Sequence, residues 1–269
     1  MENSMKLAMD GQEDICVEYA RVSGGTVEKH EPDYTTYNSL SGWYGRNCFI
    51  APKEEDIDRI VKEILKRKKQ GYPTMITYAQ ELQPSNCADV LEENGYSLFL
   101  TQNGMFFDLV NSPVDEEICP DIVTIDTACV NNPDYQKIRQ ASIAADRVHE
   151  WTEVMTEGFK PEKELEYEVY DNLVKSENMI LYAFLKDGKI AGTSMILLRE
   201  NNSGIHEVAV PPVNRYQKIA TKLVIRILQD LKKLGRTEVS LQASPFGYPV
   251  YSKIGFQETC HIHTWKTNA

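Results

Sequence analysis

The residue types best suited to chemistry gather in positions 204–256 of this 269-residue chain. A β-type segment, GIHEVAV, ends at two prolines and is followed by a long amphipathic segment, 215–235. The start of a helix presents unpaired N–H groups and a partial positive charge, which suits a phosphate group. We therefore predict that residues 215–221 form an anion site, although a solvated helix start would also explain the basic residues Arg215, Lys218 and Lys222.

The strand before this helix carries two residues that could move a proton. Strand alternation would place Ile205 and Glu207 on one face, and His206 and Val208 on the other. An imidazole with an ordinary pKa of about 6.5 suits proton transfer near neutral pH. A half-buried histidine whose hydrogen bonds are satisfied is the alternative interpretation.

The elements around these residues alternate between helix and strand. A turn at Lys186-Asp187-Gly188-Lys189 predicts an antiparallel hairpin over 180–198. This order predicts an α/β or α+β fold. The other predicted elements of the second half are strand 123–126, helix 134–148, helix 161–176 with Pro161 in its first turn, strand 204–210, helix 215–235, strand 238–244, helix 247–254 and strands to about 266.

The length, at roughly 150 residues per domain, indicates about two domains. Segment 111–121 has two prolines, four acidic residues and little apolar periodicity, so it reads as a linker. We predict domains at 1–115 and 116–269. The elements expected in the first half are helix 5–21, helix 54–70, strand 74–79 and helix 85–94.

The two halves share a weak internal repeat. Residues 91–105 and 251–265 align without a gap, with Gly95-Tyr96 opposite Gly255-Phe256. A helix end, a glycine, an aromatic residue and a strand then occur twice, which predicts a tandem of two similar folds unless the pattern arises by chance. Tyr251 corresponds to Leu91 in this alignment.

Three motifs resemble the GNAT superfamily of acyl-CoA-dependent N-acetyltransferases. They are Val208-Ala209-Val210-Pro211, Arg215-x-x-Lys218-x-Ala220 and Tyr251-x-x-x-Gly255-Phe256. The resemblance covers the order of elements from about 121 to 266. The first half looks like a degenerate copy of the same fold, without a matching phosphate turn.

The resemblance implies tandem GNAT-like folds, each with a mixed central sheet flanked by helices, and acetyl-CoA as co-substrate. Lys218 stands where the family has a glycine. It would adopt a helical conformation, add a cation near the phosphates, or mark a weakened site. The residues implied to bind acetyl-CoA are Val208, Ala209, Val210, Arg215, Tyr216, Gln217, Lys218, Ile219, Ala220 and Thr221.

The same resemblance implies direct attack of an amine on the thioester. His206 would be the base, through water if needed, with Glu207 as its rival. A backbone N–H near Val210 would polarise the thioester carbonyl. Tyr251 would protonate the departing thiolate; the alternative is that it only packs in the core. Leu91, the corresponding residue of the first half, has no proton to donate.

Composition narrows the classes of function and cellular location that remain. There are 29 basic and 40 acidic residues, a net charge of −11, so binding of a nucleic acid backbone is not expected. No apolar run reaches about 18 residues and the N-terminus does not read as an export signal, so we expect no membrane association. Six cysteines without a Cys-x-x-Cys pair indicate a cytoplasmic protein.

Other features of the sequence are less specific. His261-x-His263 lacks a third ligand, so we expect no metal site. Residues 149–153 would recognise an amine or form a solvated loop. The expected partner is a small-molecule or peptide amine, and a homodimer is possible. The alternative function is a catalytically inactive acyl-CoA-binding or interaction protein.

Overall fold

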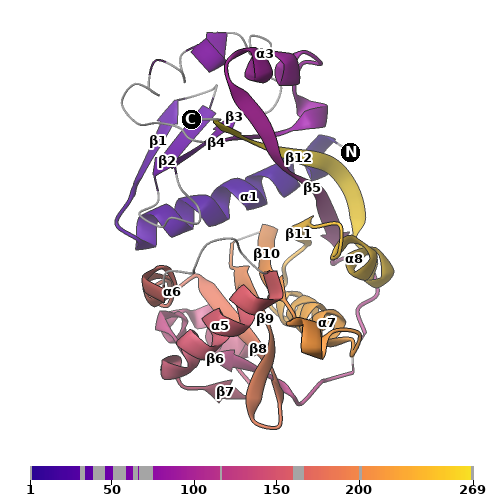
Figure 1. Cartoon of the computed structure of the whole chain (residues 1–269). Coiled ribbons are helices and arrows are strands. Elements are labelled where there is room, and N and C mark those ends of the chain that lie inside the picture. Colours follow the sequence, from indigo (N-terminus) through magenta and orange to yellow (C-terminus); the bar gives the residue numbers. More distant parts are fainter. Residues whose placement is uncertain are drawn as a thin grey trace. The chain divides into compact units, whose positions relative to one another are not determined.

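The computed structural model describes residues 2–30, 34–38, 46–50, 59–62, 66, 75–115, 117–159, 167–199 and 202–267 (Figure 1). They form two compact units. The first comprises Met1–Met105, Gln242–Tyr248 and Glu258–Ala269, and the second Phe106–Leu241 and Pro249–Gln257. Both units are discontinuous in sequence, whereas the sequence predicts one boundary at 115/116, which stays a prediction.

The first unit contains a mixed sheet in the order β1-β2-β3-β4-β12-β5. The pairs β1–β2, β2–β3 and β4–β12 are antiparallel, and β3 and β4 run parallel. Helix α1 (Glu2–Val22) packs on β1, β2 and β4. The other elements are β1 (Thr26–His30), β2 (Tyr34–Asn38), β3 (Arg46–Ile50), β4 (Met75–Ala79), the 3-10 turn η1 (Gln80–Leu82), α3 (Cys87–Glu93), β5 (Tyr96–Asp108) and β12 (Gln257–Thr267).

These elements confirm the predicted helices at 5–21 and 85–94 and the strand at 74–79. Of the predicted helix 54–70, residues 59–62 and 66 are helical, and the other positions lie outside the described residues. The described positions of the predicted linker, 111–115 and 117–121, contain no helix or strand, but they lie inside the second unit. A linker between domains at 111–121 therefore stays a prediction.

The predicted internal repeat has a structural counterpart. Gly95 after α3 and Gly255 after α8 (Tyr248–Ile254) both have positive φ, at 81° and 116°. The aromatic residues that follow, Tyr96 and Phe256, are both buried and each leads into a long strand, β5 or β12. Each half therefore contains the same helix–glycine–aromatic–strand unit.

The second unit contains a mixed sheet in the order β11-β10-β9-β8-β6-β7. Strands β10 and β11 run parallel, as do β6 and β7, and the other pairs are antiparallel. The strands are β6 (Ile122–Ile125), β7 (Ser142–Ile143), β8 (Met179–Lys186), β9 (Lys189–Leu197), β10 (Asn202–Ala209) and β11 (Glu238–Ala243).

Helices α5 (Val148–Phe159) and α7 (Ile219–Lys233) cover opposite faces of this sheet. A Cβ on Gly192 would lie 2.5 Å from Ile219 of α7, and a Cβ on Gly158 of α5 would lie 2.7 Å from Ala209, which pairs with Thr193. The mixed sheet flanked by helices confirms the predicted fold class. The remaining elements are α4 (Pro133–Ile138), α6 (Tyr167–Leu173) and the 3-10 turns η2 (Ala128–Asn131), η3 (Ala145–Arg147) and η4 (Pro212–Asn214).

A buried ion pair within α7 is hydrogen-bonded to the sheet. Arg226 donates from Nε to Asp230 Oδ2 at 2.9 Å, and Tyr182 of β8 donates its hydroxyl proton to the same oxygen at 3.1 Å. All three side chains are buried. Removing one partner of such a network would leave a buried charge without compensation. The bonds from the Tyr182 hydroxyl to Asp230 and from Arg226 Nη1 to the carbonyl of Ile122 connect α7 to β8 and β6. None of the described helices has the length and apolar character needed to cross a bilayer.

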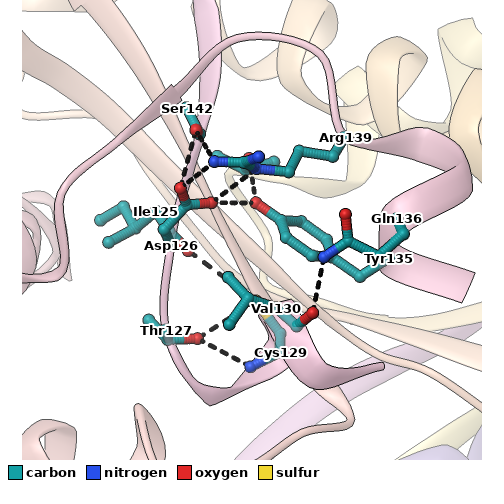
Figure 2. Close-up of polar contacts among 10 residues, drawn as sticks. Ile125, Asp126, Thr127, Cys129, Val130, Tyr135, Gln136, Arg139 and Ser142 are labelled. Atoms are coloured by element: carbon teal, nitrogen blue, oxygen red, sulfur yellow. Dashed lines mark hydrogen bonds and ion pairs between the residues drawn. The ribbon is translucent and has the colours of Figure 1, made fainter. Parts of the chain in front are cut away.

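The predicted helix 134–148 is wrong beyond Ile138. Four donors converge on the carboxylate of Asp126 (Figure 2): Arg139 through two nitrogens, the Ser142 hydroxyl at 2.9 Å and the Tyr135 hydroxyl at 2.8 Å. Arg139 leaves the helical conformation, with ψ 123°. The chain then pairs with β6 as β7, because this tertiary cluster outweighs the local helical pattern.

The solvated-loop interpretation of residues 149–153 is also wrong. They lie in helix α5, and Trp151 is fully buried, with Nε1 donating to the carbonyl of Tyr182 at 2.8 Å. Trp151 is therefore a core residue of the second unit. His149 contacts Asp171 of α6 instead, with Nε2 2.7 Å from Oδ1.

Candidate functional site

Helix α7 begins later than the sequence predicts. Its first residue is Ile219, and residues 215–218 form a loop. Tyr216 and Lys218 both have positive φ, at 62° and 60°. These left-handed conformations interrupt the helix, so the predicted start near 216 is corrected to 219.

Left-handed backbone is costly for residues other than glycine, at about 1–2 kcal/mol each. Among the described residues, four such positions exist: Asp187 in the β8–β9 turn, and Glu207, Tyr216 and Lys218. Three of the four therefore lie in β10 or the loop before α7. The helical interpretation of Lys218 is wrong, because Lys218 holds the conformation that a glycine would adopt most easily.

The loop and the first turn of α7 leave backbone amides unused. Lys222 donates the first helical bond, from its N to the carbonyl of Lys218 at 2.9 Å. Within the described part of the chain, the amides of residues 216–221 donate no backbone hydrogen bond, and no side chain caps the helix. With no acidic residue in its first turn, this helix start fits an anion.

Side chains brace this loop against three neighbouring elements. Arg215 donates from Nε to the carbonyl of Val210 at 3.1 Å and from Nη2 to that of Gly158 at 2.9 Å. Asn214 donates to the carbonyl of Ala191 at 3.3 Å. Arg215, predicted to bind the co-substrate, thus supports the loop through at least two of its donors.

Strand β10 is irregular where it reaches this loop. Its pairing with β11 ends at Ile205 opposite Leu241, although β10 continues to Ala209. Its register with β9 shifts between His206 and Ala209, and Glu207 has φ 51°. The predicted alternation of side chains between the two faces of this strand therefore fails from Glu207 onward. The backbone of residues 206–209 does not pair with β11.

His206 is a buried, neutral imidazole. Its side chain lies at the end of the β10–β11 pairing, the residue is 9% exposed, and Nε2 has no hydrogen-bond partner among the described residues. Burial lowers its pKa to about 3, and the charge of Arg199 acts in the same direction. His206 can accept a hydrogen bond at neutral pH, but the structure as it stands opposes its protonation.

Tyr251 lies in α8 with a buried ring, and its hydroxyl makes no hydrogen bond to a residue that the structure describes. Its ring meets the Phe256 ring edge-on, with the ring centroids 5.9 Å apart. The Phe256 ring packs against Phe107, with their centroids 5.1 Å apart. Burial raises the pKa of Tyr251, so the hydroxyl keeps its proton. The amide of Phe256 donates to the carbonyl of Tyr251 at 3.0 Å, which explains the spacing in Tyr251-x-x-x-Gly255-Phe256.

The structure joins the loop, β9, β10 and α5 through direct contacts, but no hydrogen bond among the described residues links Tyr251 to His206. Sequence reasoning missed the brace at Gly158, whose carbonyl accepts from Arg215 and where an added Cβ would lie 3.0 Å from the backbone nitrogen of Val210. The only available signal was a glycine between the predicted helices 134–148 and 161–176. His261 contacts Glu81, with Nδ1 2.5 Å from Oε1, and the described residues contain no cluster suited to a metal ion.

The comparisons with known proteins agree with this arrangement. A family model described as "Acetyltransferase (GNAT) domain" matches residues 140–263. That range includes β10, the loop before α7, and α8. No curated protein sequence matches the chain.

Several solved structures share the fold of this chain. A GCN5-related N-acetyltransferase from Kribbella flavida matches with TM-score 0.65 and 11% identity, over 99% of this chain and 96% of that one. One from Sphaerobacter thermophilus matches with TM-score 0.57 and 14% identity, over 89% and 82%. A tandem GNAT protein from the clavulanic acid biosynthesis pathway matches with TM-score 0.53 and 11% identity, over 87% and 78%. The predicted tandem GNAT-like fold is thereby confirmed.

Proposed function

We propose that the protein transfers the acetyl group of acetyl-CoA to the amine of a small molecule or peptide, because residues 140–263 match the GNAT acetyltransferase domain model. One observation carries this proposal. The amides of residues 216–221 donate no backbone hydrogen bond among the described residues, and their loop, with two left-handed residues, follows the interrupted strand β10. A diphosphate is the anion whose size and charge suit such a row of donors.

The residues present fit acetyl-CoA, which supplies the acetyl thioester. The amides of 219–221 would hold the diphosphate, and the exposed Lys218 would add a positive charge. Residues 208–210, next to the bulge, would supply backbone N–H groups to the acetyl carbonyl. Arg215 would act by bracing the loop rather than by contact with phosphate.

Two side chains would handle protons. Tyr251 would give its hydroxyl proton to the departing sulfur. Burial keeps that proton on the hydroxyl at neutral pH, and the hydroxyl makes no hydrogen bond to a described residue. His206 would take the proton of the attacking amine on a ring nitrogen. Because its pKa is near 3, this role requires a partner or water that stabilises the charged ring. Glu207 is the rival base, since the bulge removes the alternation argument against it.

A non-catalytic acyl-CoA-binding protein is the second candidate function. The non-glycine residues in the loop and the low pKa of His206 favour it. Calorimetric titration with acetyl-CoA, followed by a turnover assay on a panel of amines, separates the two. Turnover that is lost in Tyr251→Phe supports the transferase. Binding without turnover on any amine supports the binding protein, and absence of binding contradicts both.

A further inference from the structure

Two neighbouring polar atoms in the second unit are buried without a partner. Among the described residues, neither Nε2 of His206 nor Oγ of Ser240 makes a hydrogen bond, and Ser240 is fully buried. Buried polar groups in proteins are nearly always satisfied, by protein atoms or by an ordered water. Two such atoms on paired strands of one sheet indicate that they share a partner, such as one buried water.

The strand register brings these two atoms together. Ser240 of β11 pairs with Gly204 of β10, so their Cα–Cβ directions point to the same face. His206 is two residues further along β10, and its Nε2 occupies the place where a Cβ on Gly204 would lie. Neighbouring strands lie about 4.8 Å apart. Because the two atoms make no direct hydrogen bond, one buried water between them is the partner that would satisfy both.

The two ring nitrogens of His206 differ in their surroundings. Nε2 is enclosed, whereas Nδ1 makes no hydrogen bond to a described residue and is not among the enclosed unsatisfied atoms. Nδ1 is thus the nitrogen open to an incoming group. The hydrogen bond made by one ring nitrogen decides which of the two carries the proton.

We propose that Ser240 is a positioning residue, whose hydroxyl holds one buried water that accepts the Nε2–H of His206 and so leaves the Nδ1 lone pair free. The fixed tautomer does not depend on the proposed function. The catalytic use of this tautomer does rest on the proposed function. The amine would give its proton to Nδ1 of His206 as the amine nitrogen bonds to the acetyl carbon and the carbon–sulfur bond of the thioester breaks. Ser240 would then also satisfy the charged ring.

The tautomer is measured by 15N NMR of the five histidine side chains, with His206→Gln identifying the His206 signals. We expect the Nε2–H form in the wild type, a mixture of forms in Ser240→Ala, and its recovery in Ser240→Thr. Gly204→Ala, whose Cβ would displace the ring, should also lose the fixed form. Ser203→Ala is the matched control, because Ser203 is equally buried but faces the other side of β10. A wild-type Nδ1–H form, or no change in Ser240→Ala, overturns the proposal.

Turnover gives an independent readout. With an amine that the wild type acetylates, Ser240→Ala should lower kcat about tenfold without changing KM for acetyl-CoA, and Ser240→Thr should restore it. Unchanged kcat overturns the catalytic part. If the wild type acetylates no amine, the proposed function fails while the NMR result still decides the tautomer.

Discussion

Lys218 and Tyr216 place charge and aromatic surface at positions whose backbone favours glycine. Both side chains are exposed, and Tyr216 is fully so. Their left-handed conformations persist because Arg215, Asn214 and the first turn of α7 fix the loop on either side. Strain of this kind is retained where the surrounding structure imposes it, and it gathers at functional sites.

Replacing Lys218 by glycine should stabilise the protein. Lys218→Gly relieves the left-handed backbone, and we expect the free energy of unfolding to rise by about 0.5–1 kcal/mol after the entropy of glycine in the unfolded chain is deducted. Denaturant unfolding measures the change. Lys218→Ala is the control, because it removes the same charge and keeps the strain. An equal gain in both variants would contradict the backbone explanation.

Tyr251→Phe should separate binding from chemistry. Because the hydroxyl makes no hydrogen bond to a described residue, its loss should leave stability and acetyl-CoA affinity unchanged. We expect kcat to fall by about 10²-fold, the usual effect of removing a general acid. Tyr248→Phe, one turn earlier in α8, is the matched control and should keep wild-type kcat. If Tyr251→Phe keeps the wild-type kcat, another group must protonate the departing thiolate.

At the scale of elements, segments with strong local signals were predictable and those set by distant partners were not. The hairpin β8–β9 follows its Asp187-Gly188 turn, and α7 follows its apolar stripe. The break after Ile138 depends on Asp126, which lies on another element, so periodicity alone could not reveal it. The bulge at Glu207 and the left-handed Lys218 were hidden for the same reason, since neither residue type favours positive φ.

The Asp126 cluster should support the α4–β7 segment in a pH-dependent way. The hydrogen bond from Arg139 lowers the pKa of Asp126, so its contribution to stability is present above the unfolded-state pKa of about 3.9 and is lost as pH falls below it. We expect Asp126→Asn to lower the free energy of unfolding by about 1 kcal/mol at pH 7, since the pair is partly solvated.

That difference between wild type and Asp126→Asn should shrink as the pH is lowered towards 3, measured by urea unfolding at several pH values. Asp146→Asn, at an exposed position in the same segment, is the control and should show little difference at any pH. A gap between wild type and Asp126→Asn that is constant with pH would mean that the carboxylate charge is not what stabilises the segment.

At the scale of the whole molecule, the two similar folds differ in the side chains at their corresponding positions. The repeated helix–glycine–aromatic–strand unit was visible in the sequence, and GNAT structures match the chain over most of its length. The discontinuous units were not predictable, because residues of β5, β11 and β12 divide between them. Leu91, fully buried in α3, stands where the second fold has Tyr251 and offers no proton.

Only the second fold should bind the co-substrate. Calorimetric titration of the full chain with acetyl-CoA should therefore give one site per chain, and Lys218→Glu should weaken it because an acid would face the diphosphate. Lys232→Glu, the same charge change at the other end of α7, is the control and should leave the affinity near that of the wild type. Two equivalent sites per chain would contradict the assignment of a single working fold.

The most direct measurement is a crystal structure of the full chain with acetyl-CoA. The account predicts diphosphate oxygens within hydrogen-bond distance of the backbone nitrogens of residues 219–221, with Tyr216 and Lys218 still left-handed. Acetyl-CoA bound with its diphosphate elsewhere, while those nitrogens face only solvent, would contradict it.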